Sequence, residues 1–435
     1  MSGNSNLKDR FLKLTFINIL SNITIPLVGL VDTAMLGHLG DIRFLAGVAL
    51  AVILFDYVYW TFGFLRMGTT GTTAQAIGRG DLKGAYHVLY RSLVLALGVA
   101  GALLILQWPL RELGFLLLAG EPGVEQAGRA YFNARIWGAP ATLCNFAFLG
   151  WYLGREESHN ALIMTVVGNL ANILFNYIFI IRLQMAAYGA GLATMVSQYL
   201  MLAVALVILM RVRQSIPWRW HEVLHPGELS ALFRLNGDIL IRTLCLITSF
   251  AIFTNFSSLL GTVILAANTI LIRLLTLAAY LIDGAAFASE SLAGVFRGAG
   301  DIPALRRLFR LSLLAGLGFA LLFLTALFIS PDLYYRILTS HTEVIGTAAT
   351  YDIWLWPTLL FGSLAYMYDG LFLGLTAGRT LRRSMMFSTL VVFLPPAIIA
   401  VYLQNNHLLW GSLAVFMITR AATLGWAGRS YLMEK

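Results

Sequence analysis

The hydrophobic and polar positions divide the chain into long apolar runs separated by short polar segments. The runs are continuous, and a helix needs ~20 such residues to cross the core of a bilayer. A transmembrane β-barrel would instead alternate apolar and polar residues over strands of about 10 residues. The pattern therefore predicts an all-α polytopic membrane protein with about twelve spans. They are expected at residues 11–39, 43–68, 85–107, 127–149, 159–181, 186–210, 236–259, 263–290, 308–330, 347–373, 384–403 and 407–430.

The composition supports this prediction. Of the 435 residues, 59% are hydrophobic and 12% are charged. A soluble domain averages ~25% charged residues and could not bury so much apolar surface. No small-residue cleavage site follows the first apolar run, so no cleavable signal peptide is expected.

The net charge of +9 reflects the topology of the chain. Most lysine and arginine residues fall in loops on one side of the predicted spans, as the positive-inside rule requires of cytoplasmic loops. The opposite loops hold only Arg43, Arg111, Arg129, Arg135, Arg182 and Arg336. We therefore expect both termini in the cytoplasm and contact with anionic lipids, and no nucleic-acid partner.

The two halves of the chain resemble each other at an offset near 220 residues. The matched segments are Arg79-Gly80-Asp81 with Ala299-Gly300-Asp301, Trp137 and Pro140 with Trp354 and Pro357, and Gly150 and Gly154 with Gly370 and Gly374. The polar stretch Arg211–Arg234 separates the halves. We predict an N-terminal six-helix lobe (1–212), a cytoplasmic linker (213–235) and a C-terminal six-helix lobe (236–435). Such a parallel repeat is typical of transporters that work by alternating access.

Asp32 is the clearest functional candidate among the polar residues of the spans. A charged group in hydrocarbon costs ~2.5–3.5 kcal/mol on insertion scales, so we expect Asp32 to have a functional or structural role. Pro26 lies six residues earlier and can kink the helix, because proline cannot donate to the preceding turn. A bendable helix that carries a carboxylate is a candidate protonation switch. The alternative is a structural carboxylate that neighbouring amides satisfy.

Three further polar residues fall at a similar depth. Asn172, Asn176 and Thr194 lie ~8–14 Å from the outer ends of their spans, against ~10 Å for Asp32. Asn172 and Asn176 are four residues apart and share a helix face. Asp56 lies deeper, at ~18 Å, and could line the same cavity. These residues form either a supporting polar network and substrate cavity or ordinary polar contacts between helices.

The second half carries its ionisable residues elsewhere. Phe253 stands near the position that corresponds to Asp32. Five ionisable residues fall near the inner ends of their spans: Asp238, Arg242, Asp283, Glu290 and Asp369. We expect an inner-side ion-pair cluster that helps to close this side of the protein, with a second ion site as the alternative. Arg273 also falls within a span, and the sequence gives it no partner.

The two sets of six spans, the internal repeat and the span that carries Asp32 together resemble the multidrug and toxic compound extrusion (MATE) family. Gly29–Leu39, Leu65–Gln75, Gly168–Tyr177 and Leu281–Gly284 resemble the DinF branch of that family. The resemblance implies an antiporter that expels xenobiotics, driven by protons or sodium, with Asp32 as the coupling residue and bending at Pro26. Many relatives read Asn-x-x-x-Asp where this chain has Asn172 and Asn176. One carboxylate fewer weakens a hard Na⁺ site and favours protons, unless Asp56 replaces the missing charge.

Two other functions remain open at this point. A sodium-coupled drug antiporter, or a flippase for lipids or lipid-linked precursors, would share the fold. An enzyme would need a nucleophile with its base, or a metal-spaced histidine set, and the sequence has no His-Glu-x-x-His, Gly-x-Ser-x-Gly or P-loop motif. We therefore expect no enzyme activity, no metal and no cofactor. The expected partners are small hydrophobic or cationic xenobiotics, protons or Na⁺, and membrane lipids. We expect a monomer in a bacterial inner membrane.

Overall fold

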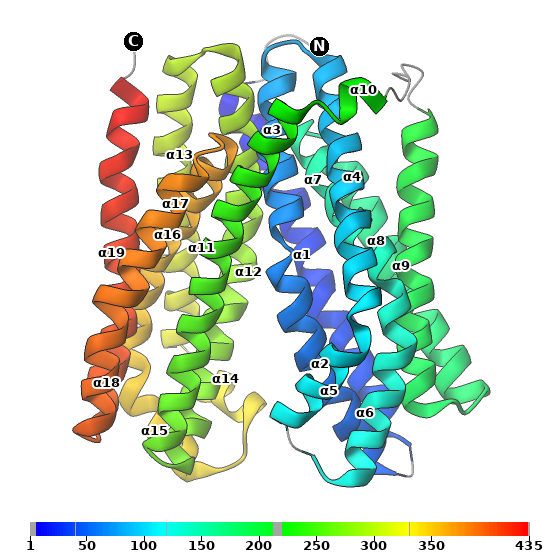
Figure 1. Cartoon of the computed structure of the whole chain (residues 1–435). Coiled ribbons are helices and arrows are strands. Elements are labelled where there is room, and N and C mark those ends of the chain that lie inside the picture. Colours follow the sequence, from blue (N-terminus) through cyan, green and yellow to red (C-terminus); the bar gives the residue numbers. More distant parts are fainter. Residues whose placement is uncertain (1–5, 40, 119, 212–219, 330, 434–435) are drawn as a thin grey trace. The chain divides into compact units, whose positions relative to one another are not determined.

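The structure is a computed structural model of the whole chain, and it describes residues 6–39, 41–118, 120–211, 220–329 and 331–433. The side chains of residues 25–28, 30 and 331–333 lie outside this description. Within the described ranges the chain is helical and contains no strand. It forms two compact units, Leu20–Leu232 and Met1–Ile19 with Phe233–Lys435. Figure 1 shows that the helices of each unit run alongside one another.

The first unit contains most of the N-terminal half. Its elements are α1 (Leu7–Gly37, shared with the second unit), α2 (Ile42–Thr61), α3 (Phe64–Gly78), α4 (Leu82–Ile105), α5 (Gln107–Leu118), α6 (Pro122–Arg135), η1 (Ile136–Gly138), α7 (Ala139–Gly154), α8 (Ser158–Asn176), η2 (Tyr177–Arg182), α9 (Ala186–Arg211) and α10 (Trp220–Val223).

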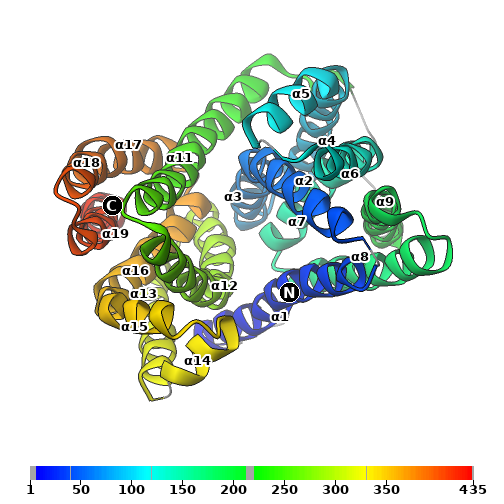
Figure 2. The same ribbon diagram turned by 90° about the horizontal axis from the view of Figure 1, so that it is seen from below.

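The second unit contains most of the C-terminal half. Its elements are α11 (Pro226–Leu259, which begins in the first unit), α12 (Thr262–Ala299), α13 (Ile302–Ile329), α14 (Pro331–Leu338), α15 (Thr342–Tyr351), η3 (Asp352–Trp354), α16 (Leu355–Gly374), α17 (Gly378–Phe387), η4 (Ser388–Phe393), α18 (Leu394–Tyr402) and α19 (Asn406–Met433). Figure 2 shows α12, α13 and α16 side by side, in agreement with their packing contacts.

Nine helical segments of the described residues are long and apolar enough to cross a membrane. The spans predicted at 85–107, 186–210, 308–330 and 407–430 match α4, α9, α13 and α19 to within six residues at each end. The span predicted at 43–68 is two helices, α2 and α3, which together continue to Gly78. Of the predicted linker, residues 213–219 lie outside the described ranges, and the rest forms α10 and the start of α11.

The spans predicted at 127–149 and 347–373 are each interrupted by a short 3₁₀ turn. The turns are η1 and η3, and they contain Trp137 and Trp354. Pro140 and Pro357 lie in the first turn of the helix that follows each break. Proline is tolerated there because the first N–H groups of a helix have no internal partner. The sequence pairs Trp137/Pro140 and Trp354/Pro357 therefore mark the same break in both halves.

The backbone confirms the internal repeat at an offset of 220 residues. Gly80 and Gly300 both have left-handed φ angles, of 74° and 72°. Asp81 and Asp301 follow them, and each carboxylate caps the next helix by accepting from a backbone N–H three residues on. Other left-handed positions also repeat at this offset, although none is a glycine: Glu156 with Thr376, and Gln184 with Gln404.

Two helix crossings repeat in the same way. A Cβ atom added at Gly150 or Gly154 would lie 2.4 Å from the carbonyl oxygen of Arg66 or 2.6 Å from that of Thr70. The matching glycines, Gly370 and Gly374, approach the carbonyl oxygens of Ala286 and Glu290 equally closely. Only glycine allows backbones to pack at this distance. The glycine pairs in the sequence are therefore close contacts of α7 with α3 and of α16 with α12.

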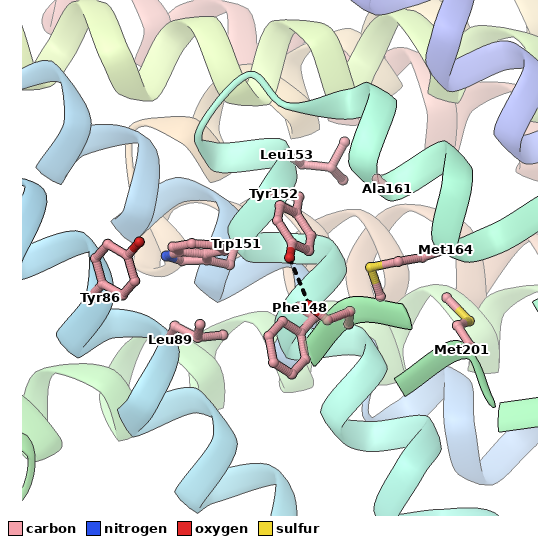
Figure 3. Packing of buried hydrophobic residues seen from close by; sticks show 10 residues of the cluster. Tyr86, Leu89, Phe148, Trp151, Tyr152, Leu153, Ala161, Met164 and Met201 are labelled. Carbon is pink, nitrogen blue, oxygen red and sulfur yellow. Dashed lines mark hydrogen bonds between the residues drawn. The ribbon is translucent and has the colours of Figure 1, made fainter. Parts of the chain in front are cut away.

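The core of the N-terminal unit lies between α4, α7, α8 and α9 (Figure 3). Trp151 and Tyr152 are fully buried there, and their rings pack edge to face with centroids 5.1 Å apart. The indole N–H donates to the carbonyl of Ala85 at 2.9 Å, and the Tyr152 hydroxyl donates to that of Ala205 at 3.0 Å. The polar atoms of both rings are thus satisfied inside an apolar cluster.

Candidate functional site

Asp32 lies on α1 and is half-buried in the N-terminal unit. Its Oδ1 accepts a hydrogen bond of 2.5 Å from Nδ2 of Asn176, the last residue of α8. The π-helical turn η2 begins at the next residue. Such turns are rare and frequently lie at functional sites, because they re-aim the side chains beside them.

A chain of hydrogen bonds extends from Asp32 across three helices. The amide of Asn176 also donates to Oδ1 of Asn172 at 3.0 Å, so both of its N–H groups are used. Nδ2 of Asn172 donates to the hydroxyl of Thr194 on α9 at 3.3 Å. The hydroxyl of Thr194 in turn donates to the carbonyl of Ala190 at 3.1 Å. The structure thus brings together Asp32, Asn172, Asn176 and Thr194, as the common depth predicts.

A second contact ties α1 to α8 further along the helix. The Asn169 amide donates to the hydroxyl of Thr24 at 2.8 Å. Thr24 and Asp32 are eight residues apart, or ~12 Å along the helix. Pro26 falls between these two contacts, within an unbroken α1. The side chain of Pro26 lies outside the described part of the chain, so the kink there stays a prediction.

Arg135 belongs to this site, although the sequence analysis assigned it to a loop. It is the last residue of α6, and its guanidinium attracts the carboxylates of both Asp32 and Asp56. Its Nη1 donates to the hydroxyl of Tyr131 at 2.9 Å. The guanidinium carbon lies 4.5 Å from the ring centroid of Phe55, a cation–π contact. The signal in the sequence was that Arg135 falls within the span predicted at 127–149.

The position of Asp56 differs from that of the other candidates. Its side chain is exposed on α2, and its attraction to Arg135 is the link to the site. The hydrogen bonds that join Asp32, Asn176, Asn172 and Thr194 run between these four residues. Arg135 therefore links Asp56 electrostatically to Asp32.

The C-terminal unit holds a buried ion cluster around Asp369, on α16. Arg420, on α19, is fully buried and donates to Oδ2 of Asp369 at 2.6 Å. Arg242, on α11, pairs with the same oxygen atom and is also buried. Two buried guanidinium groups thus share one carboxylate oxygen. We call these three residues the Asp369 cluster.

The other predicted members of the inner-side cluster have different surroundings. Asp238 is buried and pairs with Arg382 at 2.5 Å. Asp283 interacts electrostatically with Tyr366. Glu290 is fully buried on α12. Of the five predicted residues, Arg242 and Asp369 thus form a direct ion pair, which Arg420 joins. Asp283 acts on the same tyrosine, Tyr366, as these three residues.

Arg273 differs from the two clusters of buried polar residues in its exposure to the surroundings. The side chain of Arg273 is exposed on α12. Among the described residues, no group of three or more His, Cys, Asp or Glu side chains could hold a metal ion.

Repeated units of membrane-length helices with ionisable groups buried between them define a multi-pass membrane protein built as a transporter. The MatE family model matches residues 18–178 and 239–399. The chain is 34% identical over 408 residues to DNA damage-inducible protein F of Escherichia coli (strain K12), covering 93% of this chain and 88% of that protein. The chain belongs to the MATE family of transporters and, within it, to the DinF branch.

Solved structures of the family have the same fold. A solved structure described as the outward-facing conformation of a multidrug resistance MATE family transporter aligns with a TM-score of 0.88 at 20% identity, covering 98% of this chain and 96% of that one. A structure described as MATE in the bent conformation aligns with a TM-score of 0.87 at 21% identity and the same coverage. The chain thus has the two-lobed fold of twelve membrane helices that these transporters share.

Proposed function

We propose that this protein is a proton-coupled multidrug efflux antiporter. It exports hydrophobic or cationic xenobiotics by alternating access, and protonation of Asp32 is the coupling step. The observation that carries the proposal is the hydrogen bond from Asn176 to Asp32, which joins the carboxylate to a chain of amide and hydroxyl groups. The MATE relatives support drug transport as the activity, since one of them is described as a multidrug resistance transporter.

The coupling follows from what a carboxyl group can do in this network. The carboxylate only accepts hydrogen bonds and attracts Arg135. Once protonated, Asp32 loses its charge and gains a donor, so its hydrogen bond from the Asn176 amide and its attraction to Arg135 both weaken. Because α1 also contacts α8 at Thr24, this weakening favours a different path of α1 between the two contacts, around Pro26.

Two features favour protons over sodium. Na⁺ binds oxygen ligands and benefits from carboxylate charge, as hard cations do. The α8 positions beside Asp32, Asn172 and Asn176, carry neutral amides, and Arg135 partly neutralises the charge of Asp32. In the C-terminal unit, Oδ2 of Asp369 is already bound to two guanidinium groups, which would repel a cation.

The proposal also covers the membrane that holds the protein and its oligomeric state. We place the protein in a bacterial inner membrane, with both termini in the cytoplasm, because of the distribution of arginine and lysine. The transporter is proposed to work as a monomer in contact with membrane lipids. A sodium-coupled drug antiporter and a lipid flippase are the competing functions.

Efflux of a fluorescent cationic dye from proteoliposomes tests the ion. Wild-type protein is expected to move dye under an imposed pH gradient in sodium-free buffer. Collapse of the pH gradient is expected to stop the movement. If dye moves only under a sodium gradient, the proton assignment is wrong and the sodium-coupled antiporter replaces it.

A further inference from the structure

A hollow of about 740 Å³ lies between α13, α16 and α19, within the C-terminal unit. Phe309 and Tyr368 line its floor. Gly425 lies on its α19 side, where an added Cβ atom would stand 3.0 Å from the Tyr368 hydroxyl. The groove thus exists in part because α19 carries a glycine at this point.

The charged residues that line this groove are all arginines: Arg306 and Arg310 on α13, and Arg429 on α19. Nε and Nη2 of Arg306 donate to the backbone carbonyl of Leu432, which fixes its guanidinium at the end of α19. Arg306 keeps further N–H groups for a ligand, because a guanidinium has five. The side chains of Arg310 and Arg429 are exposed. We call this site the basic groove.

The surroundings of the basic groove are those of a membrane surface. Both α13 and α19 are long and apolar enough to span a bilayer. Leu314 and Leu322 on α13 are 69% and 67% exposed, which suits contact with lipid chains. Trp426 lines the groove and is 77% exposed. Arginine and tryptophan near the ends of spanning helices sit at the level of the lipid headgroups.

The N-terminal half provides an internal comparison for these residues. At the offset of 220 residues, the positions of the basic groove correspond to the apolar cluster of Figure 3. The pairs are Tyr86 and Arg306, Leu89 and Phe309, Tyr90 and Arg310, Phe148 and Tyr368, Ala205 and Gly425, and Leu209 and Arg429. The same fold is therefore packed there without any of these arginines, so folding alone does not explain them.

From these observations we infer that the basic groove binds an anionic phospholipid. Arg310 and Arg429, with the remaining donors of Arg306, hold the phosphodiester of the headgroup, because guanidinium groups bind phosphate oxygens in pairs. The acyl chains lie along the apolar surface beside Trp426. The lipid belongs to the leaflet on the side where the chain ends. This site is separate from the network around Asp32 and does not rest on the proposed transport activity.

Fluorescence quenching by brominated lipids tests the inference with the full-length protein. The protein is reconstituted in phosphatidylcholine that contains a small fraction of either brominated phosphatidylglycerol or brominated phosphatidylcholine. The fluorescence of Trp426 is obtained by subtracting the fluorescence of a matched protein that carries Trp426→Phe from that of each protein tested. Brominated phosphatidylglycerol is expected to reach half-maximal quenching at a lower mole fraction than brominated phosphatidylcholine. The two mole fractions should differ by a factor of roughly five for each arginine that contacts the headgroup.

Matched variants separate the groove from general surface charge. Arg310→Gln with Arg429→Gln should abolish the preference for phosphatidylglycerol. Arg307→Gln should keep it, since Arg307 is exposed on the same helix but does not line the groove. Ala422→Phe fills the groove, leaves the arginines in place and should also abolish the preference. Size-exclusion profiles confirm that each variant is folded.

Three results would overturn the inference. One is equal quenching by the two lipids in wild-type protein. The second is a loss of preference in Arg307→Gln as large as in the groove variants, which would indicate unspecific charge. The third is full displacement of phosphatidylglycerol by inorganic phosphate, which would make the site one for free phosphate.

Discussion

Asn176 donates a 2.5 Å hydrogen bond to Asp32 and thereby links the last turn of α8 to the carboxylate on α1. The amide uses its second N–H on Asn172. The protonation state of Asp32 is thus connected through one side chain to a row of groups that ends at Thr194. This relationship gives the first prediction.

Asn176→Asp should make dye efflux respond to sodium. The change places two carboxylates in direct contact, where like charges disfavour double ionisation and attract a cation. Efflux at neutral pH is expected to rise with added sodium in this variant and to stay constant in wild-type protein. Asn169→Asp is the matched control, because Asn169 lies on the same helix but bonds Thr24. A sodium response of equal size in the control would contradict the prediction.

Asp369→Asn should strongly destabilise the protein. The substitution leaves the buried guanidinium groups of Arg242 and Arg420 without their shared counter-charge. Breaking a buried pair in this way costs about 3–5 kcal/mol. Thermal unfolding in detergent measures the change. Asp41→Asn, which breaks the exposed pair of Asp41 with Arg43, should leave the melting temperature unchanged. Equal melting temperatures for Asp369→Asn and wild-type protein would show that the cluster contributes no stability.

Gly154→Ala and Gly374→Ala should each lower the free energy of unfolding by about 1–3 kcal/mol. The added methyl group would meet a backbone carbonyl oxygen, of Thr70 or of Glu290, and a backbone atom cannot rotate away. Gly98→Ala is the matched control, since no atom lies within 4 Å of its added Cβ. That control should be neutral or slightly stabilising, as alanine favours a helix over glycine. If all three variants behave alike, the close helix crossings are not required.

Glu112→Gln should not change the pH dependence of transport between pH 5 and 8. Glu112 lies outside the predicted spans, and hydrogen bonds from Arg129 and Arg111 lower its pKa from 4.5 to about 2. A carboxyl group with a lowered pKa adds stability above its ordinary pKa and loses it as the pH falls through the folded value. Its titration is therefore complete well below pH 5. A shifted pH profile in this variant would mean that the outer loops take part in proton coupling.

Much of the fold could be predicted from the sequence because membrane spans and repeats are local patterns. The matches of Gly150 with Gly370 and of Gly80 with Gly300 identified contacts and turns that the structure contains. The common depth of Asp32, Asn172, Asn176 and Thr194 likewise predicted their hydrogen-bonded chain. Depth along a helix is fixed by the rise per residue, so this kind of prediction needs no tertiary information.

Two residues of the candidate sites, Arg135 and Arg420, were not predicted, because their partners lie on other helices. Arg135 was counted with the outer loops, because the sequence did not show that the break at η1 turns it towards Tyr131 and Asp32. Arg420 was not predicted, although an arginine within an apolar span requires a partner. That partner, Asp369, lies 51 residues away in the chain, and only the packing of α16 against α19 identifies it.

The most direct test of the central claim is the proton movement that accompanies drug binding and transport in Asp32→Asn. Wild-type proteoliposomes with a trapped pH dye should show proton movement opposite to that of the drug. The variant, in which asparagine keeps the shape but cannot be protonated, should fold normally and show none. Drug-driven proton movement at the wild-type rate in Asp32→Asn would contradict the account, and would make Asp32 a structural residue.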